Sequence, residues 1–248
     1  MPKKKVFELN PNISVDCVVF GFDLEKLNIL LIDRGESQFV SNNSLALPGD
    51  LIYNNENLHQ AAYRVLEELT GLKNIYLEQI GAFGDPNRIS KEEDRLWLES
   101  IRDNPEARVV TIAYFSLVKM EDYPLKASSF AKKAIWIPVK EIEKLAFDHF
   151  EILQAAKIKL KEKIKIHPIG FNLLPEKFTL SQLHKLYESI LDKELDKRNF
   201  RRKVQKMNLL KRLFEKQEYV PHKPSELYKF NEEKYQELAK NGFNNFGF

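Results

Sequence analysis

The stretch PGDLIYNNENLHQAAYRVLEELTGL, residues 48–72, decides the fold of the first half of the chain. It starts as a loop and continues as an amphipathic helix that is predicted to begin near Asn57 and to end at Gly71. Glycine is typical of a helix end because it adopts a left-handed backbone without strain. β-rich runs lie on either side, at residues 15–22 and 75–83. The sequence therefore predicts an α/β domain in which this helix packs on a sheet.

The spacing within this stretch resembles the Nudix box, in which a glycine, five residues, a glutamate and seven residues precede Arg-Glu-aliphatic-x-Glu-Glu-x-Gly-aliphatic. With Arg64 at the arginine position, Val65 and Leu69 stand where the family has glutamates. The agreement in spacing and the flanking strands argue against a chance match in an ordinary helix. The degenerate box consists of Asp50, Glu56, Arg64, Val65, Glu68, Leu69 and Gly71.

The two missing glutamates bear on catalysis. In Nudix hydrolases the helix carboxylates collect Mg²⁺ or Mn²⁺ at a diphosphate, because hard divalent cations need several oxygen ligands. Here Glu68 remains from that cluster, and Glu67 cannot substitute since adjacent helical residues point about 100° apart. The resemblance implies a Nudix fold without strong pyrophosphatase activity, with no catalytic residue, metal or cofactor. Two alternatives stay open for Val65 and Leu69: they line a solvent-accessible pocket, or they fill the core.

Charge is distributed unevenly along the 248-residue chain. Residues 1–150 hold 18 Lys and Arg against 23 Asp and Glu, a net charge of −5, whereas residues 151–248 hold 21 against 13, a net charge of +8. A basic second part indicates a polyanionic partner. The chain has no long apolar run, no signal-peptide pattern and a single cysteine, Cys17. We therefore expect a cytoplasmic protein without a membrane segment or an internal disulfide.

From Gly170 the sequence predicts two helices across a short break, GFNLLPEKFTLSQLHKLYESILDKELDKRNFRRKVQKM, capped by Thr179 and Asp196. The second helix has an apolar stripe on one side and basic and amide residues on the other. It is a helix-turn-helix candidate, and the strands around PHKP would form its wing. A solvated charged helix is the alternative. The predicted DNA-binding residues are Lys197, Arg198, Asn199, Arg201, Arg202, Gln205, Lys206, His222 and Lys223.

The degenerate box together with GFNLLPEKFTLSQL and LDKRNFRRKV resembles the Nudix-related transcriptional regulators of the NrtR type, and within them the arabinose regulator (AraR) branch. The resemblance covers residues from about 12 to 235. It implies an α/β/α Nudix sandwich followed by a winged helix-turn-helix domain. It also implies a homodimeric repressor that binds double-stranded operator DNA and releases it when a small molecule binds.

The domain boundary is predicted in a lysine-rich stretch, residues 157–165, whose alternation with apolar residues fits a helix end, an edge strand or a linker. We expect a Nudix-like effector-sensing domain at residues 1–160, a winged helix-turn-helix domain at 161–240 and a tail at 241–248. A long connection, residues 84–108, departs from the compact form of the AraR branch. Connections of this length are usually functional or disordered.

The effector follows from the resemblance. NrtR-type regulators respond to ADP-ribose and the AraR branch to a pentose. We expect an L-arabinose-like pentose and control of sugar-utilisation genes. The alternatives are an ADP-ribose-responsive regulator of NAD metabolism and a Mg-dependent hydrolase of ADP-ribose or nucleotide sugars. A diphosphate requires cations or helix N-termini, and a sugar requires hydrogen-bond partners and an aromatic wall. The candidates that could serve either ligand are Arg34, Asp85, Asn87, Arg88, Trp136, Asp148 and His149.

Overall fold

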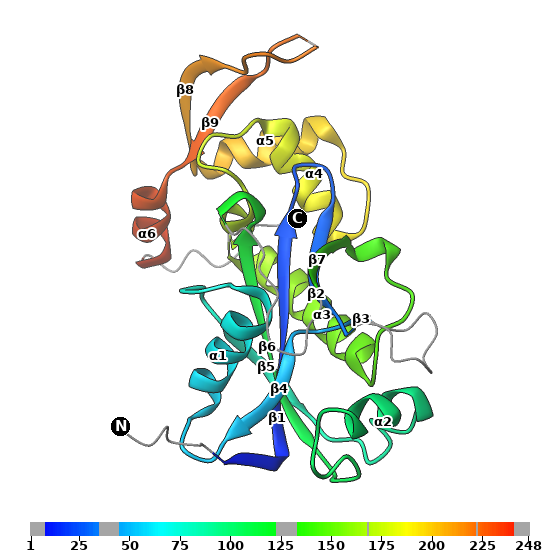
Figure 1. Cartoon of the computed structure of the whole chain (residues 1–248). Helices are drawn as coiled ribbons and strands as arrows, with labels where there is room; N and C mark the ends of the chain where they lie inside the picture. Colours follow the sequence, from blue (N-terminus) through cyan, green and yellow to red (C-terminus); the bar gives the residue numbers. More distant parts are fainter. Residues whose placement is uncertain (1–7, 35–44, 123–132, 168, 222, 241–248) are drawn as a thin grey trace, which may run out of the picture. The chain divides into compact units, whose positions relative to one another are not determined.

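The structure is a computed structural model that describes residues 8–34, 45–122, 133–167, 169–221 and 223–240 (Figure 1). The chain divides into two compact units. The first holds residues 1–21 and 28–156, and the second holds residues 22–27 and 157–248. Within the described ranges, no helix combines the length and the apolar character needed to cross a membrane.

The first unit is built on a sheet that has seven strands in the described residues (Figure 1). The strand order is β3-β2-β1-β6-β5, and β4 pairs with β1 while β7 pairs with β2. The strands are β1 Leu9–Phe22, β2 Leu27–Asp33, β3 Leu45–Ala46, β4 Gly49–Tyr53, β5 Glu78–Phe83, β6 Val110–Lys119 and β7 Lys133–Pro138.

The central strand β1 shows that both faces of this sheet are covered, because successive side chains of a strand point to opposite faces. Val15 and Cys17 belong to the core that α1 (Leu58–Thr70) packs against. Asp16 points to the opposite face and lies 3.4 Å from the first side chain of α3 (His149–Ile166). The strand thus separates an apolar layer under α1 from a polar layer at the start of α3.

Helix α1 begins and ends as its sequence predicts. Asn57 forms a capping box with Gln60, in which each side chain accepts a hydrogen bond from the other residue's backbone N–H. Gly71 follows the helix with φ of 80°, the left-handed backbone that favours glycine. The buried face of the helix consists of Ala61, Ala62, Val65, Leu66, Leu69 and Thr70.

The segments between and after the strands of the sheet also contain helical structure. The long connection 84–108 contains a short helix, α2 (Glu92–Glu99), and single turns of 3₁₀-helix occur at Met120–Asp122 and Val139–Glu141. The lysine-rich stretch 157–165 is helical, as part of α3. Ala156, Leu160 and Ile164 explain why, since they are spaced by four and are all buried.

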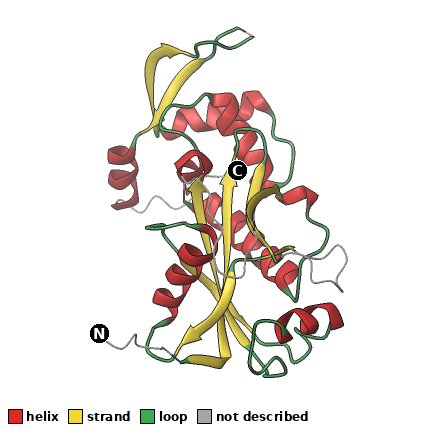
Figure 2. Cartoon of the chain, in the orientation of Figure 1, coloured by secondary structure: helices red, strands yellow, loops and turns green. Residues whose placement is uncertain are grey.

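The second unit contains a pair of capped helices followed by a two-stranded antiparallel sheet (Figure 2). The Thr179 hydroxyl accepts from the Gln182 N–H, and the Asp196 carboxylate accepts from the Asn199 N–H at 2.7 Å, so both predicted caps are present. The elements are a 3₁₀ turn at Ile169–Leu173, α4 Leu180–Leu191, α5 Lys197–Met207, β8 Leu210–Lys216, β9 Glu226–Phe230 and α6 Glu232–Lys240.

Candidate functional site

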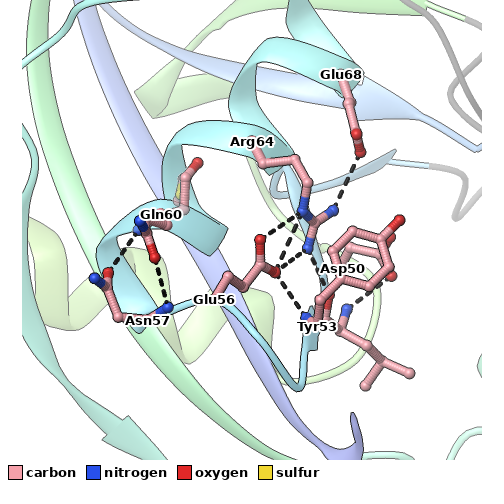
Figure 3. Close-up of polar contacts among 10 residues, drawn as sticks. Asp50, Tyr53, Glu56, Asn57, Gln60, Arg64 and Glu68 are labelled. Carbon is pink, nitrogen blue, oxygen red and sulfur yellow. Dashed lines mark hydrogen bonds and ion pairs between the residues drawn. The ribbon is translucent and has the colours of Figure 1, made fainter. Parts of the chain in front are cut away.

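The loop and the helix of the box are joined by Arg64 (Figure 3). Its Nε and Nη2 donate to the Glu56 carboxylate at 3.0 and 2.6 Å, and its Nη1 donates to Glu68 at 3.1 Å. Nη2 also donates to the Leu51 carbonyl at 2.9 Å, while the guanidinium lies 4.2 Å from the centre of the Tyr53 ring. Burial alone would lower the pKa of Arg64, but the two carboxylates raise it. These contacts hold the loop against the helix.

The two positions at which the Nudix box has glutamates, Val65 and Leu69, are part of the core here. Val65 is 0% exposed and Leu69 is 2% exposed, and both belong to the apolar cluster beneath α1. Glu68 instead turns toward Arg64. In the described part of the chain, no group of three or more His, Cys, Asp or Glu side chains is placed to hold a metal ion. The box residues therefore do not fit the Mg²⁺ that Nudix hydrolases hold there.

A cavity of about 490 Å³, including space open to solvent, lies in the first unit. The segment that contains α2 forms part of its wall through Arg88, Trp97, Ile101 and Arg102. Phe147 adds a second aromatic side chain. Its charged and titratable side chains are Asp16, Asp50, Arg88, Arg102 and His149. The cavity thus combines two guanidinium groups, two carboxyl groups and an imidazole with two aromatic rings.

A buried ion-pair network forms one side of the cavity. Arg88 donates to the Asp148 carboxylate at 2.9 and 2.8 Å and to Asp16 at 3.4 Å. His149 accepts a hydrogen bond from the Leu47 N–H at its Nδ1, 3.0 Å away, and its Nε2 lies 3.4 Å from Asp16. Burial lowers the pKa of His149, although Asp16 and Asp148 oppose that shift. The network fixes the orientation of the Arg88 and His149 side chains.

The box loop reaches the same cavity at Gly49 and Asp50. Gly49 pairs with Asp16 across β4 and β1, and a Cβ added to Gly49 would lie 1.8 Å from the Asp16 carboxylate. A side chain at position 49 would therefore displace the Asp16 carboxylate. Asp50, which stands at the first-glycine position of the box, accepts the Leu51 N–H at 2.7 Å. Burial raises the pKa of Asp50 above its ordinary value.

Three of the predicted effector-binding residues come together at the cavity. Arg88 and His149 line it, and Asp148 holds Arg88. Their contact with an effector stays a prediction. Asp16 and Arg102 also line the cavity, although neither is predicted from the sequence. Asp16 lies in an apolar run, VDCVVF, where a single acidic residue could have been noticed, whereas Arg102 has no local signal.

The other four predicted effector-binding residues do not line the cavity. Arg34 forms a buried ion pair with Asp94, with Nη1 and Oδ1 3.0 Å apart. Asp85 accepts the N–H of Asn87 at 2.7 Å and so forms a turn. Trp136 lies on β7 within the sheet, and its ring closely approaches Gly21 on β1. These positions serve the fold in the observed arrangement.

The second unit presents α5 as a basic helix. Its apolar side is anchored by Phe200, which is 2% exposed and packs edge-on against the rings of His184 and Tyr187. All seven predicted DNA-binding residues of the helix are exposed: Lys197, Arg198, Asn199, Arg201, Arg202, Gln205 and Lys206. Lys223 is also exposed, and His222 lies outside the described residues.

Comparison with known proteins agrees with the division of the chain into two parts. A family model of the NUDIX domain matches residues 10–156, and a model of the NrtR DNA-binding winged helix domain matches residues 170–230. The ADPR responsive transcriptional repressor NtrR of Acinetobacter baylyi is 30% identical over 225 residues, which cover 89% of this chain and 82% of that protein. The chain belongs to the NrtR-type Nudix regulators.

Two other similar proteins extend the comparison of this NrtR-type chain. The crystal structure of Shewanella oneidensis NrtR complexed with a 27mer DNA has a TM-score of 0.67 and 26% identity, and the match covers 90% of this chain and 95% of that one. The ADP-ribose pyrophosphatase of Methanocaldococcus jannaschii is 29% identical over 153 residues, or 61% of this chain and 76% of that protein. The predicted fold class, a Nudix domain followed by a winged helix domain, is confirmed. The arabinose branch finds no support among these relatives of the NrtR type.

Proposed function

We propose that the chain is a homodimeric transcriptional repressor that binds operator DNA through α5 and releases it when ADP-ribose binds the Nudix domain. The observation that carries the proposal is that one chain pairs a charged cavity in the Nudix domain with an exposed basic helix in a winged helix domain. The Acinetobacter baylyi relative, an ADPR responsive repressor, supports it. In this proposal residues 1–160 sense the effector and residues 161–240 bind DNA in the cytoplasm.

The chemistry of the cavity supports ADP-ribose over a pentose. ADP-ribose carries a diphosphate, hydroxyl groups and an adenine ring. The cavity offers Arg102 as a cation, Asp16 as a hydrogen-bond acceptor, and the rings of Trp97 and Phe147. A neutral pentose would give this guanidinium no anion to bind. We therefore propose ADP-ribose, the alternative effector considered from the sequence, in place of the pentose.

The proposal includes the loss of strong pyrophosphatase activity. Val65 and Leu69 fill the core, and Glu56 and Glu68 are paired with Arg64, so the described residues of the box supply no group of carboxylates placed to hold a metal ion. A Mg-dependent hydrolase is the second candidate, and it is favoured by the likeness to the Methanocaldococcus jannaschii ADP-ribose pyrophosphatase. Turnover of ADP-ribose with Mg²⁺ at about 1 per second or faster would decide for the hydrolase.

Effector and operator are expected to weaken each other's binding by the same factor. A ligand shifts an equilibrium only through its different affinities for the two states, and this coupling is reciprocal. For a coupling of about 1–3 kcal/mol, saturating ADP-ribose should lower the affinity for operator DNA about 5–150-fold, and the operator should lower the affinity for ADP-ribose equally. The measurement is calorimetric titration of ADP-ribose with and without a DNA fragment that the protein selects from a random pool.

L-Arabinose is the comparison ligand in the same titrations, with EDTA present to prevent hydrolysis of ADP-ribose. Equal ADP-ribose affinities with and without DNA would remove ADP-ribose as the effector. A DNA-dependent affinity for L-arabinose would restore the pentose hypothesis.

The exposed face of α5 is expected to carry DNA affinity. Replacing Arg198, Arg201 or Arg202 by alanine should weaken DNA binding, and loss of a phosphate contact should also flatten the log–log salt dependence by about one unit. The measurement is fluorescence anisotropy at several salt concentrations, with Lys144→Ala, an exposed lysine of the first unit, as the control. Unchanged affinity for DNA in all three arginine variants would show that the helix is a solvated charged surface that does not bind DNA.

A further inference from the structure

The two arginines that line the cavity have different surroundings. Arg88 has three hydrogen bonds to carboxylate oxygens of Asp148 and Asp16. The Nε of Arg102 is shielded from solvent and has no hydrogen-bond partner in the described part of the chain. A buried donor without an acceptor destabilises the folded state. Arg102 therefore requires an explanation that Arg88 does not.

The charge of Arg102 is attracted by its neighbours but is not fully compensated. Burial lowers the pKa of Arg102, and the nearby carboxyl groups of Asp50 and Asp16 only partly oppose this shift. The Asp50 carboxylate already accepts the Leu51 N–H, and Asp16 already accepts from Arg88. The cavity thus holds a guanidinium whose environment disfavours its charge.

The backbone at Arg102 is fixed. Its N–H donates to the Leu98 carbonyl at 2.8 Å, and the Leu98 side chain is 0% exposed. Trp97 and Ile101, from the same segment, also line the cavity. The long connection 84–108 is therefore an ordered wall of the cavity that places Arg102 beside it.

We propose that Arg102 binds a phosphate of the effector. The planar guanidinium of Arg102, which lines the cavity, matches phosphate oxygens with two parallel N–H donors, and a phosphate would compensate the charge that Asp50 and Asp16 leave partly uncompensated. Arg88 is held by two carboxylates and acts instead as a fixed part of the wall. This proposal rests on the proposed function and deepens it, because it restricts the effector to phosphate esters and diphosphates. It also gives the long connection a role in selecting the ligand.

The test compares the full chain with its Arg102→Gln variant. The control is Arg95→Gln, since Arg95 lies on α2 in the same segment but is half exposed and 3.7 Å from Glu106. Three ligands are titrated in EDTA by calorimetry and by thermal shift: ADP-ribose, inorganic pyrophosphate and adenosine. Loss of a charge-assisted contact should weaken ADP-ribose binding by Arg102→Gln about 10–100-fold and abolish the thermal shift with pyrophosphate. Adenosine binding should be the same in all three proteins.

The melting temperature without ligand separates a binding role from a structural one. If Arg102 serves the ligand, Arg102→Gln without ligand should melt at or above the temperature of the unchanged chain, because a poorly compensated buried charge has been removed. A variant that melts lower and yet binds ADP-ribose with unchanged affinity would overturn the proposal.

The failures of the two proposals are distinguishable. If the unchanged chain binds ADP-ribose and Arg102→Gln binds it equally well, the role of Arg102 is overturned while the proposed effector stands. If the unchanged chain does not bind ADP-ribose, the proposed effector fails. In that case, a thermal shift by pyrophosphate that disappears in Arg102→Gln still supports the phosphate site, and no pyrophosphate shift in the unchanged chain overturns it.

Discussion

The double variant Val65→Glu/Leu69→Glu is expected to unfold the first unit rather than restore a hydrolase. Both side chains are buried in the core beneath α1. A buried carboxylate without a partner lowers the free energy of unfolding by several kcal/mol. Two of them would remove most of the roughly 5–15 kcal/mol by which a typical domain is stable. Circular dichroism during thermal or urea unfolding measures the loss.

This loss should depend on pH in a defined direction. Burial raises the pKa of a carboxyl above its unfolded value, so the folded form keeps protons that the unfolded form releases. Stability therefore decreases as pH rises through the raised pKa, and the double variant should be less stable at pH 8 than at pH 5. Tyr63→Glu, on the exposed side of the same helix, is the matched control and should change stability little. A double variant as stable as this control would show that positions 65 and 69 reach solvent.

Removal of the Asp94 carboxylate is expected to destabilise the first unit strongly. The Arg34 and Asp94 side chains are 1% and 0% exposed, and the second carboxylate oxygen of Asp94 accepts the Phe147 N–H at 2.7 Å. The paired Nη1 and Oδ1 are close but are not aligned as a hydrogen bond. Asp94→Ala leaves Arg34 without this carboxylate, and breaking a buried ion pair costs about 3–5 kcal/mol.

Urea unfolding of Asp94→Ala can be compared with that of Glu106→Ala. Glu106 forms an exposed ion pair with Arg95 at 3.7 Å, and exposed pairs contribute about 0–1 kcal/mol. Equal decreases in the free energy of unfolding of the two variants would mean that water or another group replaces the Asp94 carboxylate beside Arg34.

Local sequence signals predicted the elements on which the fold depends. The capping residues Asn57, Thr179 and Asp196 are all used as such, and Gly71 ends α1 in the left-handed conformation. These signals are readable because a cap and its partner are three residues apart. The secondary structure of residues 157–165 was ambiguous because two patterns coincide there. Lysines at every second position suggest a strand, whereas the apolar residues that are buried in the helix are four positions apart.

The contents of the cavity could be predicted only in part. Arg88, Asp148 and His149 were expected, and the structure brings them together. Arg34 was expected to face a ligand, but its partner Asp94 lies 60 residues away in the chain, and no local pattern indicates that pairing. Arg102 was overlooked because a residue in a long connection can be placed beside a cavity only when the path of that connection is known.

The Arg64 ion pairs have a consequence for sorting Nudix-like genes. Arg64 donates to both Glu56 and Glu68, so the presence of these three residues indicates that the loop is held against the helix. Positions 65 and 69 are the places at which the Nudix box has two further glutamates. A search that scores all positions of the box equally does not separate a chain that keeps only the contacts of Arg64 from one that also has these glutamates. Scoring the two sets of positions separately would make that distinction from the sequence.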